Sequence, residues 1–111
     1  FKAFVLGCAL CAGAVQASTV EFFTGNDLYK LMLSADPKDT TLAGGYVMGV
    51  SDVLSGVAVC LPVNVSGLQL YEIAKRRIAD APEMRHYQAS SILIAMLSKL
   101  YPCNKNSKGN L

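Results

Sequence analysis

Residues 59–70, VCLPVNVSGLQL, end one helix and begin the next, and this junction decides the fold. Pro62 lacks the backbone N–H that a helix interior needs, and its ring clashes with the preceding turn, so a helix that enters this stretch must end before it. Ser66 and Gln69 then have the spacing of a capping box, in which each side chain accepts a hydrogen bond from the other residue's backbone N–H. The stretch therefore predicts two helices joined by a short loop that carries Cys60.

The helix before this junction is predicted as a long apolar segment from Thr40 to about Val59. Its glycines are costly, because each destabilises a helix interior by about 1 kcal/mol relative to alanine. Gly45 and Gly49 lie four residues apart and share one face, which predicts that another helix backbone packs closely against them. A membrane-spanning helix is the alternative interpretation, but polar residues within the segment, Asp52 among them, favour a buried helix of a globular domain.

An earlier helix is predicted to start at Thr24, because a capping hydroxyl there precedes Asp27 by three residues. Apolar residues then follow at helical spacing: Leu28, Leu31 and Met32. Residues 34–39, SADPKD, contain Pro37, which fixes its own φ and biases the residue before it away from the helical region. We therefore expect a short first helix and a turn before the second.

The third helix is predicted to run from the capping box to about Asp80, with four apolar side chains facing inward: Leu70, Ile73, Ala74 and Ile78. Its basic cluster, Lys75-Arg76-Arg77, is able to contact an acidic partner, but such a run is more typical of a solvated face. A last helix is predicted from about Glu83 to Leu100, and residues 92–97, ILIAML, are apolar on all sides, as in a helix central to a core. The sequence therefore predicts an all-α fold, a small bundle of about four helices.

The first residues have the composition of an export signal. Lys2 precedes an uncharged run from Ala3 to Val15, and the small residues that follow match a cleavage site. The run is shorter than the roughly 20 apolar residues that span a bilayer. We expect residues 1–17 to be a signal peptide, residues 18–103 to form one helical domain and residues 104–111 to be a flexible polar tail. The mature protein is then expected in the periplasm, with no membrane contact after signal cleavage.

Two of the four cysteines, Cys8 and Cys11, lie within the expected signal peptide. Export places the remaining two where disulfides form and persist. The sequence therefore predicts a single disulfide between Cys60 and Cys103. The competing interpretation, a catalytic thiol with His86 as its base, needs a free cysteine, which export disfavours.

Composition argues against catalysis, metal binding and nucleic-acid binding. The sequence has one histidine and, once the cysteines pair, no cluster of metal ligands. Its formal net charge is +2, far below the basic footprint of a nucleic-acid-binding protein. Asp52 lacks a second carboxylate nearby in the sequence with which to share general acid/base work. We predict that the protein is not an enzyme and uses no cofactor or metal.

Four stretches resemble, in order and spacing, the motifs of the Tai family, periplasmic immunity proteins that neutralise type VI secretion amidase effectors: FFTGNDLYKLM (22–32), YVMGVSDVL (46–54), VCLPVNVSGLQL (59–70) and YPC (101–103). The resemblance covers about residues 22–103. It implies a non-catalytic protein, often a homodimer, that binds its cognate amidase effector and occludes the cleft that peptidoglycan enters. The family pattern has two further cysteines where this sequence has Met32 and Ala43.

Two predicted loops, residues 36–39 and 80–86, are candidate contact surfaces, because loops on a rigid scaffold commonly carry recognition. The predicted partner-binding residues within them are Asp36, Lys38, Arg85 and His86. Two alternative functions stay open. One is a small periplasmic acid-stress chaperone of the HdeA type, which is also short, helical and held by one disulfide. The other is an envelope protein that keeps the immunity fold without an effector.

Overall fold

The predicted all-α fold is confirmed by the structure, a computed structural model that describes residues 20 and 22–104. Four α-helices follow one another, with a short 3₁₀ helix before the last: α1 (Gly25–Leu33), α2 (Pro37–Leu54), α3 (Gly67–Asp80), η2 (Pro82–Met84) and α4 (Ala89–Leu100). Extended pairing among the described residues is limited to isolated bridges, Thr24 with Gln88 and Ser55 with Val59. The expected signal peptide, residues 1–17, lies outside the described residues, as do residues 105–111 of the expected tail.

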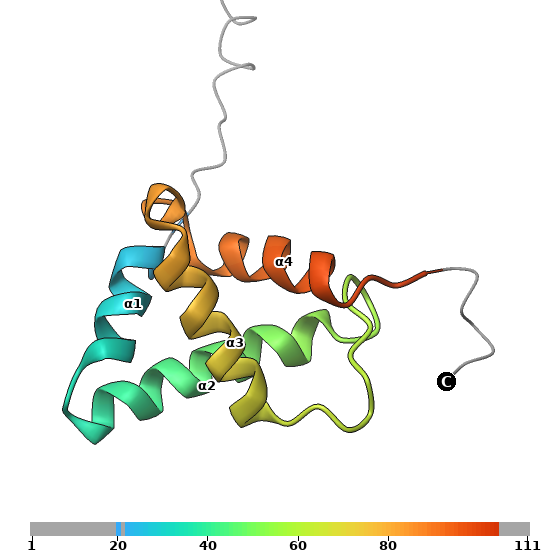
Figure 1. Cartoon of the computed structure of the whole chain (residues 1–111), viewed down its shortest axis with the longest axis horizontal. Coiled ribbons are helices and arrows are strands. Elements are labelled where there is room, and N and C mark those ends of the chain that lie inside the picture. The colour runs from blue at the N-terminus through green and yellow to red at the C-terminus, as the bar shows by residue number, and fades with distance from the viewer. Residues whose placement is uncertain (1–19, 21, 105–111) are drawn as a thin grey trace, which may run out of the picture.

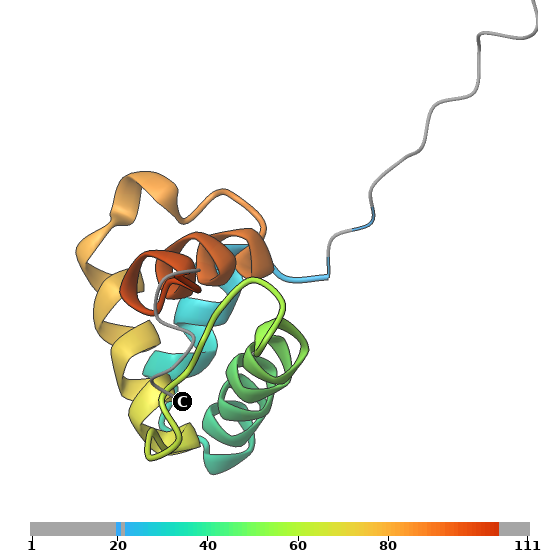
Figure 2. The ribbon, with the colours of Figure 1, turned by 90° about the vertical axis from the view of Figure 1, so that its right-hand side faces the viewer.

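The four α-helices pack so that every pair is in contact. Figure 1 shows α2 and α4 running in the same general direction, with α1 across the end of the bundle where both begin. Figure 2 shows α3 and α2 on opposite sides of the bundle, with η2 above α3. No helix within residues 20 and 22–104 has both the length and the hydropathy needed to cross a membrane.

Each helix turns an apolar face to a shared core. The inward face predicted for α3 is confirmed, because Leu70, Ala74 and Ile78 are buried and Ile73 is half-buried against the core. The buried apolar side chains come from all four helices and from the loop after α2: Leu28, Met32, Ala43, Val47, Val59, Leu70, Ala74, Ile78, Ala89, Leu93, Met96 and Leu97. The buried hydroxyl of Ser51 donates a 2.8 Å hydrogen bond to the carbonyl oxygen of Val47, so its burial leaves no unsatisfied donor.

Two helices begin where the sequence predicts, each at a capping box. The hydroxyl of Thr24 accepts from the backbone N–H of Asp27 at 3.2 Å, and the Asp27 carboxylate accepts from the backbone N–H of Thr24 at 3.0 Å. At the start of α3, the hydroxyl of Ser66 accepts from the N–H of Gln69 at 3.1 Å, and the Gln69 side chain accepts in return at 3.4 Å. Both predictions are confirmed, because these signals act within a single turn of the chain.

The predicted limits of α2, from Thr40 to about Val59, are wrong at both ends. The helix begins at Pro37, because the Asp36 carboxylate caps it by accepting from the N–H of Lys38 at 3.0 Å and proline suits a first helical position. It ends at Leu54, because Gly56 has a φ of +82°, the left-handed conformation that closes many helices. The chain then turns sharply and returns Val59 to the core.

The last helix begins six residues later than the predicted Glu83, at Ala89. Residues 82–84 form η2 instead, and the following loop pairs with the start of α1. The N–H groups of Gly25 and Asn26 donate to the carbonyl oxygens of Tyr87 and Arg85, each at 2.8 Å. These contacts join distant parts of the chain, and no local sequence signal encodes them. They keep residues 85–88 in a loop, so that α4 begins only after it.

Two packing predictions are wrong. Gly45 and Gly49 do not meet another helix backbone, since nothing lies within 4 Å of where a Cβ would stand at either position. Both are exposed on the outer side of α2. α4 is not buried on all sides either, because Ile94 is 39% exposed and Ala95 is also exposed. The apolar surface that the sequence assigned to internal packing thus lies partly on the outside of the molecule.

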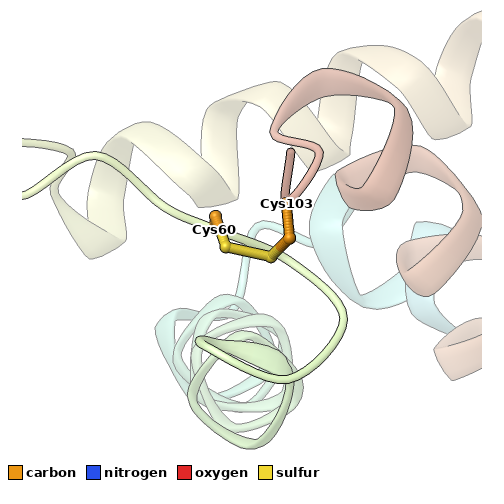
Figure 3. Close-up of a disulfide and its surroundings, with 2 residues drawn as sticks. All are labelled: Cys60 and Cys103. Carbon is orange, nitrogen blue, oxygen red and sulfur yellow. A yellow bond between two sulfur atoms is a disulfide. The ribbon is translucent and has the colours of Figure 1, made fainter. Parts of the chain in front are cut away.

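The disulfide between Cys60 and Cys103 is present, as the sequence predicts. Figure 3 shows it joining the loop after α2 to the segment after α4. The two Cα atoms lie 4.9 Å apart, and the N–H of Cys60 donates to the carbonyl oxygen of Tyr101 at 2.9 Å beside them. α4 is therefore held at both ends, by the pairing with residues 23–26 before it and by the disulfide after it.

Candidate partner-binding surface

Asp36 and Lys38, two of the predicted partner-binding residues, lie at the start of α2. The Asp36 carboxylate is engaged as the helix cap, although the side chain stays exposed. Neighbouring Asp39 accepts a 2.7 Å hydrogen bond from the hydroxyl of Ser34. Lys38 is exposed beside them. The polar groups of this loop thus mainly hold the short connection between α1 and α2.

Arg85 is a structural brace in this fold. Its guanidinium group donates to the carbonyl oxygens of Ile78 at 2.9 Å and Ala79 at 2.8 Å, near the end of α3. Its central carbon also lies 4.1 Å from the ring centroid of Tyr29 on α1, in a cation–π arrangement. Arg85 therefore ties α3, α1 and the loop after η2 together, and only part of its surface is open to a partner.

His86 is exposed, with its ring centroid 4.2 Å from that of Tyr87. The structure separates the four predicted residues into two groups, because Asp36 follows the end of α1 while the loop of Arg85 and His86 meets its beginning. α1 has nine residues and is about 13 Å long at 1.5 Å per residue. The four residues do not form one cluster.

The described part of the chain shows no group of three or more His, Cys, Asp and Glu side chains placed to hold a metal ion. A hollow of about 660 Å³ beside α1 contains acids, but its Asp27 and Asp39 already accept hydrogen bonds from Thr24 and Ser34. The backbone N–H of Thr24 and then its hydroxyl, with a smaller effect from Lys30, hold the pKa of Asp27 below its ordinary value. These acids act as helix caps and turn contacts.

Two apolar grooves flank α4, and sequence analysis predicted neither of them. The first, which we call the α2–α4 groove, has a volume of about 410 Å³ and contains the exposed glycines of α2: Gly45, Tyr46, Gly49, Val50, Val53, Leu54, Ser90 and Ile94 line it. Each glycine leaves open the space that a side chain would fill. The groove presents apolar surface without a charged side chain among its lining residues.

The second, which we call the α3–α4 groove, lies between α3, η2 and α4 and has a volume of about 460 Å³. Its lining residues are Arg77, Ala81, Met84, Tyr87, Ser91, Ile92, Ala95, Met96 and Lys99. Most of this surface is apolar, and α3 and α4 each contribute one cation to it, Arg77 and Lys99. Concave apolar surfaces with a few placed polar groups are typical binding sites in proteins.

Part of the α3–α4 groove has a signal in the sequence. Arg77 belongs to the basic cluster of residues 75–77, for which the sequence favours a solvated face. Arg76 and Arg77 of this cluster are exposed, and so is Lys99 on α4. Only Arg77 of the cluster lines the groove. Met84 and Tyr87, which form one wall, carry no comparable signal, because their position depends on the loop that pairs with α1.

A family model described as Rap1a immunity proteins matches residues 24–103 of this chain. The matched range begins at the cap of α1 and ends at the second cysteine of the disulfide, so it contains every helix described above. A comparison with curated proteins finds no match.

Proposed function

Because this chain belongs to the Rap1a immunity protein family, we propose that it protects a cell from a type VI secretion effector, a peptidoglycan amidase, by binding the amidase and covering its active site. The observation that carries the proposal is the family match over residues 24–103. That range is the whole helical domain, so the likeness concerns the folded unit and not one motif. The amidase as target is suggested by the resemblance of four sequence stretches to the Tai family.

Occlusion is a role that the fold can perform with binding alone. An inhibitor that fills or covers a catalytic cleft excludes the substrate without contributing any catalytic group. Such binding is strongest when the inhibitor is preorganised, because less conformational freedom is lost on association. The fixed ends of α4 and the Arg85 brace supply that rigidity next to the two exposed grooves.

The periplasm is the proposed compartment. Residues 1–17 have the composition of a signal peptide, and peptidoglycan lies outside the cytoplasmic membrane. The disulfide between Cys60 and Cys103 fits an oxidising compartment, where such bonds persist. The family match also favours an immunity role over the acid-stress chaperone that the sequence left open.

Inhibition of an amidase effector whose gene neighbours the gene of this chain is the direct test. The exported protein should form a stable complex with the purified amidase and abolish its release of peptide from peptidoglycan at a one-to-one ratio. A muramidase, which cleaves the glycan strand instead, is the matched control and should be unaffected. Full amidase activity in the presence of excess protein would refute the proposed function.

The compartment has a separate test in cells. The amidase directed to the periplasm should lyse cells, and co-expression of the full chain should prevent lysis. A variant without residues 1–17 should accumulate to the same level and give no protection. Equal protection by both forms would contradict periplasmic action while leaving inhibition itself intact.

The resemblance to the Tai family also suggests a homodimer. Light scattering on the exported protein should then give twice the mass of one mature chain, and the mass of the amidase complex should include two copies of it. A single-chain mass at all concentrations would exclude the dimer without affecting inhibition.

A further inference from the structure

The α3–α4 groove combines an apolar floor with unpaired positive charge. Ile92, Ala95 and Met96 of α4 form the floor, while Arg77 and Lys99 are the fully charged side chains among its lining residues. Nearby Asp80 and Glu83 are exposed but do not line the groove, although each precedes a residue that does, Ala81 and Met84 respectively. Within the described part of the chain, no hydrogen bond or ion pair engages either cation.

This charge arrangement limits what can fill the groove. Covering two cations with an apolar surface would remove them from water without compensation, which is strongly unfavourable. A segment that brings carboxylates to the edge and apolar side chains to the floor avoids that cost and gains charge-assisted hydrogen bonds. Complementary charge of this kind also speeds association and selects the partner.

The groove is rigid enough to be a preformed site. One wall, Met84 and Tyr87, is fixed because the carbonyl oxygen of Tyr87 accepts from the N–H of Gly25 and because Arg85 is bonded to the end of α3. The floor belongs to α4, whose two ends are held. A volume of about 460 Å³ is of the size that accepts a few side chains from one face of a helix.

We propose that the α3–α4 groove binds an acidic, amphipathic segment of the effector, with apolar side chains on Ala95 and Met96 and carboxylates paired with Arg77 and Lys99. This inference rests on the proposed function, since it names the effector as the occupant. The α2–α4 groove gives no comparable indication, because its lining residues include no charged side chain that would define a partner.

Charge reversal tests the assignment. Arg77→Glu and Lys99→Glu should each weaken binding of a catalytically inactive form of the neighbouring amidase by about 10- to 100-fold in calorimetric titration, as expected for reversed charges at an interface. Arg76→Glu is the matched control, because Arg76 is an exposed cation on the same helix outside the groove, and it should change the affinity by less than about threefold. Circular dichroism spectra should be the same for all three variants.

A photo-crosslinking amino acid provides an independent measurement. Placed at Ala95, on the exposed floor, it should capture the amidase, and the crosslinked amidase peptide should contain Asp or Glu beside apolar residues. The same group at Val63, which is fully exposed in the loop after α2, should not capture the amidase.

The outcomes separate the two proposals. If the wild-type protein neither binds nor inhibits the amidase, the proposed function fails and the assigned occupant fails with it. If the wild-type protein inhibits while both reversals bind normally and Ala95 gives no crosslink, only the groove assignment is overturned. Binding of anionic phospholipid vesicles that Arg77→Glu and Lys99→Glu abolish, with amidase binding unchanged, would instead assign the groove to a lipid surface.

Discussion

Gly25 lies where the beginning of α1 meets the loop after η2. A Cβ at this position would stand 2.9 Å from both the Cα and the carbonyl oxygen of Arg85, and 2.6 Å from the Cδ1 atom of Ile92. Backbone atoms cannot move aside without breaking the pairing described above. Gly25→Ala should therefore lower the free energy of unfolding by about 1–3 kcal/mol, the usual effect of overpacking, as measured by urea denaturation.

Gly45→Ala is the matched control for that substitution. Gly45 is exposed in the middle of α2 with open space around it, so alanine meets no neighbour there and restricts the unfolded chain. The free energy of unfolding should rise by about 0.5–1 kcal/mol. Equal destabilisation at both positions would contradict the close approach at Gly25 and the openness of the α2–α4 groove.

Asp27 makes the stability of α1 depend on pH. Its pKa is lowered in the folded protein by the hydrogen bonds from the backbone and hydroxyl of Thr24, so the unfolded chain binds more protons in acid. The stabilisation is therefore complete above the ordinary pKa of 3.8 and is lost as the pH falls through the lowered folded value.

The corresponding prediction concerns Asp27→Asn. This variant should melt at a lower temperature than the wild type at neutral pH, and the difference should shrink as the pH falls below 3.8. Thermal melts followed by circular dichroism from pH 7 to about pH 2 would measure it. A difference that stays constant over this range would show that the carboxylate charge contributes nothing to the cap.

At the scale of the elements, Arg85 connects the end of α3 to α1 through two hydrogen bonds and one ring contact. Arg85→Met keeps much of the side-chain bulk but removes the donors, and should lower the free energy of unfolding by about 1–3 kcal/mol. Arg85→Lys should recover only part of this, because an ammonium group lacks the planar fork that reaches both carbonyl oxygens. His86→Ala, at the exposed next residue, should change stability by less than about 0.5 kcal/mol in the same denaturation experiment.

The sequence predicts the helix limits that depend on neighbouring residues better than those that depend on contacts with distant parts of the chain. Capping at Thr24 and Ser66 depends on residues within one turn, so both starts could be located from the sequence. The end of α2 has a local signal in Gly56, but the apolar residues after it suggested a longer helix. The start of α4 depends on pairing between Gln88 and Thr24, 64 positions apart in the sequence, which no local pattern reveals.

The candidate surface was harder to predict, for a physical reason. The sequence pattern shows which residues are apolar but not whether a neighbouring helix covers them, so it predicts a core position for Ile94 and Ala95, which are exposed. The sequence offers Arg85 as a partner-binding residue because it lies in a predicted loop. Its bracing role has no sequence signal, since its hydrogen-bond acceptors are main-chain carbonyl oxygens. The cations at Arg77 and Lys99 become one feature only when α3 and α4 are placed side by side.

For the whole molecule, the disulfide is the main covalent constraint. It joins residues 43 positions apart, and closing a loop of that length stabilises a fold by up to about 4 kcal/mol on the chain-entropy model. The double variant Cys60→Ser, Cys103→Ser should lose about 2–4 kcal/mol of unfolding free energy in urea denaturation. Reduced wild-type protein should match it, whereas a reduced protein as stable as the oxidised one would contradict this role.

The same bond also determines how the molecule would respond to mechanical force. α3, η2 and α4 lie inside the covalent ring that Cys60 and Cys103 close, while α1 and α2 lie outside it. Once tension applied at the two ends of the chain has broken the non-covalent contacts, it passes along the backbone to Cys60 and then crosses directly to Cys103. About 150 Å of contour length, at roughly 3.4 Å for each of the 43 positions, cannot be extended while the bond is intact. The chain length released when such a pull unfolds the protein therefore excludes the segment that forms the α3–α4 groove.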